Sequence, residues 1–156
     1  MTHPTLNGEL EITVHTSDGR CTHRSKASNH VLLAGRAHII RCLAGTASRR
    51  DYRIAIGSNG SPTRHDAQLR LLRSLWETPS TRPLARGNYV FLTGRFTAPV
   101  EEWTVAEAGV AFREDQHYEG SVLYNRAVIE PPIHLSGGET LTLRFTLFFR
   151  WAETST

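Results

Sequence analysis

Hydrophobic and polar residues alternate most regularly near the C-terminal end of the chain. Between residues 141 and 151 every second residue is apolar, namely Leu141, Leu143, Phe145, Leu147, Phe149 and Trp151. The intervening set is Thr142, Arg144, Thr146, Phe148 and Arg150. Strict alternation over this length is typical of a β-strand with one face on a core. We therefore expect a long central strand, preceded by a turn at Gly137 and Gly138.

A β-hairpin is expected near the N-terminal end. Residues 10–14 (LEITV) and 20–24 are its strands, and Asp18-Gly19 between them is a strong two-residue turn signal. Ile12 and Val14 are nearly its only strongly apolar residues. So little apolar surface favours a hairpin arm over residues 1–26 that attaches to a partner by backbone pairing at a sheet edge, with Ile12 and Val14 at the contact. The alternative is that the hairpin extends the sheet of its own domain.

One amphipathic helix is expected after the hairpin. Ser28-Asn29 offers an N-cap, Leu33 and Gly35 are alternative starts, and Gly45 stands where a glycine ends a helix. The positions that follow the helical pattern are Leu32, Leu33, Arg36, Ala37, Ile39, Ile40, Leu43 and Ala44. Residues 52–56 then predict a buried strand. Residues 57–63 form a loop without the Gly-Lys-Ser/Thr ending that cradles phosphate.

The rest of the chain is predominantly extended. Strands are expected at residues 88–96, 103–112 and 122–129, and Pro131-Pro132 is expected to end the last of these because proline cannot donate to a ladder. A helical turn at 66–72, an extended piece at Leu75-Trp76, an exposed loop at 79–87 and a charged loop at 113–120 connect them. The fold class is mainly β, an antiparallel β-sandwich or jelly-roll-like domain with one packed α-helix and the N-terminal hairpin arm. Residues 1–156 form a single domain whose core spans residues 29–151.

Aromatic residues also occur on the strand face opposite the first apolar set. They are Tyr89, Phe91, Tyr124 and Phe148. A helix of about ten residues covers only part of such a face, so contacts with other subunits are expected as well. These four residues, with Ile12 and Val14, are the candidate interface of a homo-oligomer, a trimer or a larger ring.

Composition narrows the classes of function. The 156-residue chain carries a net charge of +3, and 17 of its 18 basic residues are arginine. Arginines and acidic residues alternate along the chain, so nucleic-acid binding through Arg49, Arg50, Arg53, Arg70 and Arg73 is not favoured. We find neither an apolar run that could span a membrane nor a signal-peptide pattern. The two cysteines, Cys21 and Cys42, cannot form a disulfide framework.

No catalytic or metal-binding motif is apparent. A Gly-x-Ser-x-Gly elbow is absent, and the acidic pairs Glu101-Glu102 and Glu114-Asp115 fall in expected loops. His15, His23, His30 and His38 lack the spacing of a zinc site. We therefore expect no enzyme activity, cofactor or metal.

Several segments, in order along the chain, resemble small tail and virion structural proteins of tailed bacteriophages. In that family a "GR..I..LLAG" helix precedes an "IALGTGTTAP" segment, followed by "EAGLF", "L.NRAVF.P" and a closing "G.TLTVTWTLTF" strand. The matching segments here are GRAHIIRCLAG at 35–45, IAIGSNGSP at 54–62, EAGVAF at 107–112, LYNRAVIEP at 123–131 and GETLTLRFTL at 138–147. Ser58-Asn59 and the Arg-rich segment 79–87 depart from the family pattern.

The resemblance covers residues 29–151 and implies a non-enzymatic structural protein on the tail or capsid surface. Such a protein would assemble in the host cytoplasm, act in the virion, and bind copies of itself and other virion proteins. The alternative is a carbohydrate-binding β-sandwich that recognises surface glycans through Trp76, Trp103, Tyr89 or Tyr118. A third hypothesis is a hydrolase that uses the loop carboxylates.

Overall fold

The computed structural model describes residues 4–47, 51–62, 71, 74–79, 81–113 and 122–151. In these residues the chain is mainly antiparallel β-structure with one α-helix, which confirms the expected fold class. The elements in chain order are β1 (Pro4–His15), β2 (Cys21–Val31), α1 (Leu33–Leu43), β3 (Asp51–Gly57), β4 (Ser74–Glu77), β5 (Leu84–Arg86), β6 (Tyr89–Thr97), β7 (Trp103–Arg113), β8 (Val122–Leu123), β9 (Asn125–Leu135) and β10 (Thr140–Trp151).

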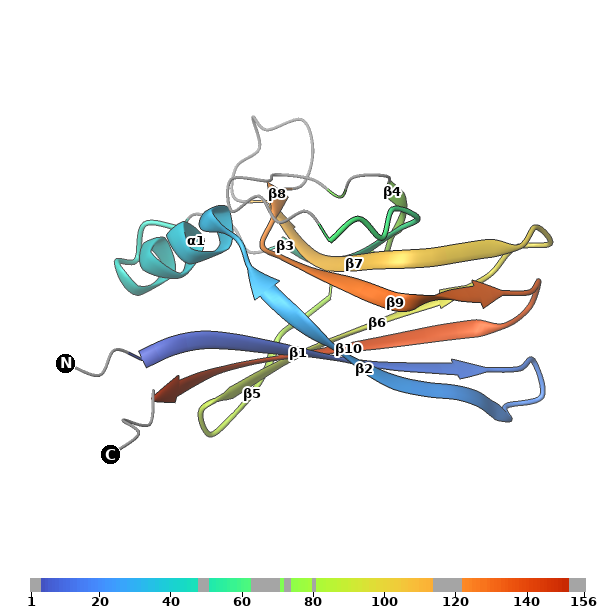
Figure 1. The fold of residues 1–156 in the computed structure, drawn as a ribbon. Coiled ribbons are helices and arrows are strands. Elements are labelled where there is room, and N and C mark those ends of the chain that lie inside the picture. The colour runs from blue at the N-terminus through green and yellow to red at the C-terminus, as the bar shows by residue number, and fades with distance from the viewer. Residues whose placement is uncertain are drawn as a thin grey trace.

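The strands form one sheet that folds into two facing layers. Its order is β4-β3-β7-β9-β2-β1-β10-β6-β5, and β8 pairs with β7. Figure 1 shows β3, β4, β7, β8 and β9 above β1, β2, β5, β6 and β10. Strand β2 joins the layers because it pairs with β1 along most of its length and with β9 only at Asn29–Val31. The result is a sandwich-like domain built from a single sheet.

The long C-terminal strand behaves as its alternation predicts. β10 pairs with β1 on one side and with β6 on the other, so it is a central strand. Leu141, Leu143, Phe145 and Leu147 are buried, whereas Arg144 on the other face is exposed.

The N-terminal hairpin forms, but its description as an arm is wrong. β1 pairs with β10 from Pro4↔Trp151 to His15↔Thr140 and lies between β10 and β2. Leu10, Ile12 and Val14 are buried in the main core. Polar residues on a second strand do not exclude it from a sheet, because its outer face contacts water while the ladder supplies its hydrogen bonds. The hairpin therefore extends the sheet of its own domain.

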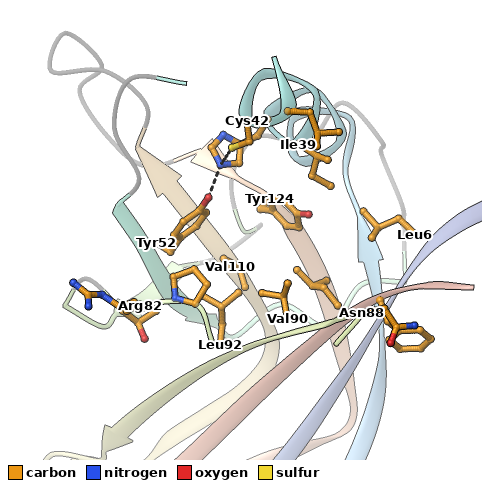
Figure 2. A pocket seen from close by; sticks show the side chains of 16 residues that line it. Leu6, Ile39, Cys42, Tyr52, Arg82, Asn88, Val90, Leu92, Val110 and Tyr124 are labelled. Atoms are coloured by element: carbon orange, nitrogen blue, oxygen red, sulfur yellow. Dashed lines mark hydrogen bonds between the residues drawn. The ribbon is translucent and has the colours of Figure 1, made fainter. Parts of the chain in front are cut away.

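Helix α1 covers one end of the space between the layers (Figure 1). It begins at Leu33, and Ser28 and Asn29 belong to β2, so the expected N-cap is not used. Its end is as predicted: Gly45 adopts φ +69°, and the N–H groups of Gly45 and Thr46 donate to Cys42 O and Arg41 O. In Figure 2, Ile39 and Cys42 lie on the side of the helix that faces Tyr52 and Tyr124.

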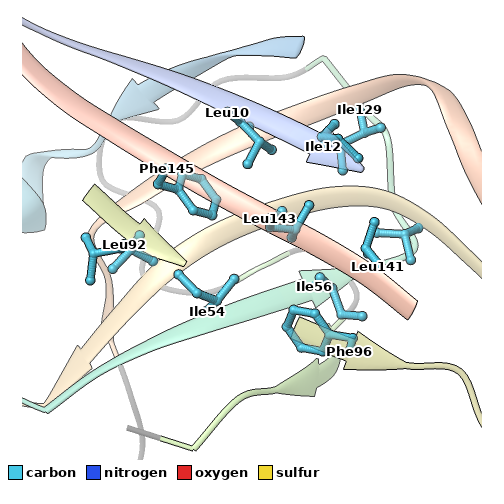
Figure 3. Close-up of a cluster of buried hydrophobic side chains, with 14 of the residues drawn as sticks. Leu10, Ile12, Ile54, Ile56, Leu92, Phe96, Ile129, Leu141, Leu143 and Phe145 are labelled. Carbon is cyan, nitrogen blue, oxygen red and sulfur yellow. The ribbon is translucent and has the colours of Figure 1, made fainter. Parts of the chain in front are cut away.

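The hydrophobic core fills the space between the two layers. Figure 3 shows Leu10, Leu143 and Phe145 of the lower layer facing Ile54 and Ile56 of β3. The approach is close at Gly94, where an added Cβ would lie 2.6 Å from the Ile54 side chain.

Two boundaries differ from the sequence-based expectation. Strand β9 continues through Pro131 and Pro132 to Leu135. The prolines are tolerated because Val128 pairs with Glu107 and Ile133 with Val105, so residues 129–132 bulge opposite a single β7 residue and need no ladder donors.

The segment 79–87, expected to be a loop, contains the short edge strand β5. The helical turn at 66–72 and the charged loop at 113–120 lie outside the described residues, apart from Leu71 and Arg113.

Candidate functional site

Three of the predicted interface residues meet on the outer face of the sheet. Phe148 is paired with Tyr89, and their ring centroids are 5.6 Å apart. Tyr89 also stacks near Phe91, at 6.3 Å, and the Arg144 guanidinium lies 4.4 Å from the centre of the Phe91 ring. Neighbouring positions on antiparallel strands bring these side chains together. We refer to Tyr89, Phe91 and Phe148 as the aromatic patch.

The other three predicted interface residues lie elsewhere. Ile12 and Val14 belong to the core, so their side chains are not available to a partner. Tyr124 is buried between Phe112 of β7 and His38 of α1, with both rings edge-on to its own. Alternation alone placed it with the aromatic patch, but it lies between β8 and β9, where the chain changes direction.

Helix α1 supplies an apolar surface that sequence reasoning missed. Leu33, Ile40 and Leu43 are 54%, 67% and 84% exposed, and we call them the outer face of α1. The helix instead buries Gly35 and His38. Gly35 is required by close approach, because an added Cβ would lie 2.2 Å from Tyr124 O. A glycine in the first turn of the helix was the available signal that this side of α1 is buried.

A pocket of about 980 Å³ opens between the layers beneath α1 (Figure 2). Helix α1 forms one wall and strands of both layers form the others. The residues lining it are mainly apolar: Leu6, Ile39, Leu43, Pro83, Val90, Leu92, Val110, Leu147 and Phe148. The polar and aromatic lining residues are His38, Cys42, Tyr52, Thr81, Arg82, Asn88 and Tyr124. Because Leu43 and Phe148 both line it, the pocket separates the outer face of α1 from the aromatic patch.

His38 connects the polar groups of this pocket. Its Nε2 lies 2.7 Å from the Tyr52 hydroxyl and 3.5 Å from Cys42 Sγ, and its ring stacks on Phe112 at 4.3 Å. A cysteine beside a histidine resembles a nucleophile and its base. However, Tyr52 makes the shorter contact with the same nitrogen, which has one lone pair in the neutral ring. The hydrogen bond with Tyr52 therefore holds the His38 ring in place and leaves this nitrogen poorly placed to act as a base for the Cys42 thiol.

The Tyr124 hydroxyl is held in its protonated form. Burial raises its pKa, and the neighbouring Tyr52 and Cys42 raise it further. At neutral pH it can therefore donate a hydrogen bond.

A buried ion pair links three of the segments that resemble the phage proteins. Arg126 Nε donates to Glu107 Oε2 at 2.9 Å, and both side chains are almost fully buried. Its Nη1 and Nη2 donate to Ser61 O and Asn59 O, each at 3.1 Å. Asn125 beside it accepts from Val110 N–H at 2.7 Å. These residues fix the loop after β3 against β7 and β9, so the local geometry gives them a structural role.

The remaining candidates do not gather into a site. Glu101 and Glu102 are exposed, and Arg53 pairs with Asp51 at 3.2 Å. Within the described residues no three His, Cys, Asp or Glu side chains are close enough to hold a metal ion. Cys21 and Cys42 are both free thiols. Tyr118, Glu114, Asp115 and four of the arginines considered above (Arg49, Arg50, Arg70 and Arg73) lie outside the described residues.

Two tryptophans of the carbohydrate alternative do lie together. The rings of Trp76 on edge strand β4 and Trp103 at the start of β7 are 6.3 Å apart. Trp76 is 59% exposed and Trp103 is partly buried.

Comparisons with known proteins found no match to this chain among family models, curated proteins or solved structures. No helix in the described part has the length and apolar content needed to cross a membrane.

Proposed function

We propose that this chain is a non-enzymatic structural subunit of a tailed phage or phage-like particle. It acts by associating with copies of itself and with other proteins of the particle, on the tail or the capsid surface. The observation that carries the proposal is the outer face of α1, where three large apolar side chains are exposed. Surface helices usually direct such residues towards the core. An apolar stripe that a domain leaves uncovered is typical of a protein contact surface.

The aromatic patch provides a second contact surface. Tyr89 is exposed, and exposed Leu84 of edge strand β5 is paired with Phe91. Aromatic residues are enriched at protein interfaces because they bury a large area with few rotatable bonds. Two different surfaces on opposite sides of one pocket favour a head-to-tail contact, which closes into a ring such as a trimer.

The resemblance to phage structural proteins supports the particle as the place of action. Three of its segments meet at Arg126, where they form a buried framework. Residues that stabilise the fold are what we expect in a protein that acts by binding other proteins and not by catalysis. Assembly in the host cytoplasm and action in the virion follow from the same proposal.

Light scattering of the purified protein tests the association. We expect a mass of at least three subunits at micromolar concentration, compared with 17.5 kDa for the monomer. The double variant Leu33→Glu/Ile40→Glu should be monomeric, because charges on the outer face of α1 would be buried without partners. Neither residue lines the pocket, so the variant tests the outer face alone.

Val100→Glu is the matched control. Val100 is 98% exposed in the connection between β6 and β7, at the end of the sandwich away from α1 (Figure 1). The Val100→Glu variant should assemble like the wild type. A monomeric wild-type protein, or an α1 variant that assembles like the wild type, would contradict the proposal.

The tryptophan pair favours carbohydrate binding as a second candidate function. Neighbouring indole rings can stack on sugar rings, and Trp76 is accessible. If a glycan binds at this pair, titration of the protein with that glycan should change the tryptophan fluorescence, and Trp76→Ala should abolish the change. Retention of the fluorescence change in Trp76→Ala would exclude this site.

A further inference from the structure

The pocket beneath α1 has the dimensions of a ligand site. Its volume of about 980 Å³ is at the upper end of the roughly 300–1,000 Å³ that small-molecule pockets occupy. Apolar side chains from both layers form most of its wall, including Leu6 of β1, Val90 of β6, Val110 of β7 and Leu147 of β10. A pocket with this lining favours a ligand that is itself mainly hydrocarbon.

Tyr124 provides a polar group in this wall that has no hydrogen-bond partner in the described protein. Its side chain is only 6% exposed. The Tyr52 hydroxyl is bonded to His38, whereas the Tyr124 hydroxyl makes no hydrogen bond to any described residue. Figure 2 shows it pointing away from Tyr52, towards the side of the pocket where Leu6 lies. The hydroxyl oxygen is accessible from the pocket, so a ligand bound there can accept a hydrogen bond from it.

The expected partner is an uncharged oxygen. A carboxylate held at the Tyr124 hydroxyl would lose its hydration and gain a single phenol as donor there, which is unfavourable. Among the described lining residues the arginine is Arg82, which is exposed to solvent and does not provide a buried counter-charge. A carbonyl or hydroxyl oxygen accepts from the phenol without this cost.

We propose that the pocket binds a neutral single-chain lipid whose carbonyl or hydroxyl oxygen accepts a hydrogen bond from Tyr124. The hydrocarbon chain lies along the apolar wall between the layers. This inference does not depend on the assembly proposed above, because the residues that carry it belong neither to the outer face of α1 nor to the aromatic patch: Tyr124, Leu6, Val90, Val110 and Leu147.

Displacement of a neutral fluorescent probe tests the proposal. Phenylnaphthylamine should bind the purified wild-type protein saturably with one site per chain. Dodecanol and dodecane should both displace it, and dodecanol should bind about three- to tenfold more tightly because of one additional hydrogen bond. In Tyr124→Phe the preference for dodecanol should be lost or reversed, because its hydroxyl would then be buried without a partner, while probe binding is kept. Tyr89→Phe on the outer sheet face is the matched control and should retain the preference.

Two variants that fill the pocket test its location. Val90→Trp places an indole in the pocket and should abolish probe binding, and Asn88→Trp does so from an exposed position at the rim. Val100→Trp, at the opposite end of the sandwich, should bind like the wild type. Thermal melts check that each variant is folded, and Tyr124→Phe should melt close to the wild type because its hydroxyl has no described partner to lose.

Three results would overturn the proposal. They are the absence of saturable probe binding by the wild type, equal binding of alcohol and alkane, and a preference for the alcohol that survives in Tyr124→Phe. Unchanged probe binding in both Val90→Trp and Asn88→Trp would place the bound probe outside this pocket and would also overturn it.

Discussion

At the scale of single residues, β10 separates core from surface over adjacent positions. Phe145 is fully buried between the layers, whereas Phe148 is half-buried in the aromatic patch. Phe145→Ala should lower the free energy of unfolding by about 3–5 kcal/mol through lost burial and a cavity. Phe148→Ala should lower it by only about 1 kcal/mol, because its ring is partly exposed already.

Urea unfolding of both variants, at a concentration where the protein is monomeric, measures the difference. Equal losses of unfolding free energy in the two variants would mean that other parts of the same chain cover the outer face of β10. If the aromatic patch also contributes to assembly, Phe148→Ala should weaken association more than Phe145→Ala does.

Among the polar residues, replacement of Arg126 should lower the free energy of unfolding most. Arg126→Met leaves the Glu107 carboxylate buried without its counter-charge and releases the carbonyl groups of Asn59 and Ser61. We expect a destabilisation of about 3–5 kcal/mol. Arg144→Met is the matched control, because its guanidinium is exposed and lies over the Phe91 ring on the outer face of the sheet; it should cost about 1 kcal/mol or less. Similar urea midpoints for the two variants would contradict the structural role of Arg126.

At the scale of elements, β1 is the clearest difference between expectation and structure. It supplies Leu10, Ile12 and Val14 to the core and pairs along its whole length with β10. Removal of residues 1–26 should therefore leave a chain that aggregates, because it exposes one edge of β10 and one side of the core. Solubility and circular dichroism of the truncated protein measure this.

A pair of point variants tests the same element without removing it. Ile12→Ala should destabilise by about 2–5 kcal/mol, whereas Thr13→Ala on the opposite face should cost about 1 kcal/mol or less. A truncated protein that melts like the wild type, or equal losses in the two point variants, would restore the interpretation as an arm.

At the scale of the whole molecule, the proposed assembly has a thermodynamic consequence. Association of folded copies stabilises the folded state by mass action, by up to about 1.4 kcal/mol for each tenfold rise in protein concentration. The urea midpoint of the wild type should therefore rise with concentration. That of Leu33→Glu/Ile40→Glu should be constant, since it is expected to be monomeric. A wild-type midpoint that does not move would argue against association through the outer face of α1.

The sequence by itself determined the local features of this protein. The side chains of a strand alternate between faces with a period of two, so the pattern at 141–147 identified both the strand and its buried face. A glycine can adopt positive φ at low cost, and for this reason Gly45 correctly marked the end of α1. The pattern also placed Tyr89, Phe91 and Phe148 on a common face, because they lie on strands that pair directly.

Only the tertiary structure decided which elements are neighbours and what each face covers. The central position of β1, the passage of β9 through two prolines and the burial of Tyr124 beneath α1 all depend on pairings between residues far apart in the chain. The same is true of the contact of Arg126 with Glu107 and the loop after β3, and of the pocket, whose walls come from α1 and strands of both layers. Alternation specifies that a face is buried, but the partner that buries it is selected by packing across the whole sheet. That selection placed Leu33, Ile40 and Leu43 of α1 outside and His38 inside, whereas Ile39 packs against the core.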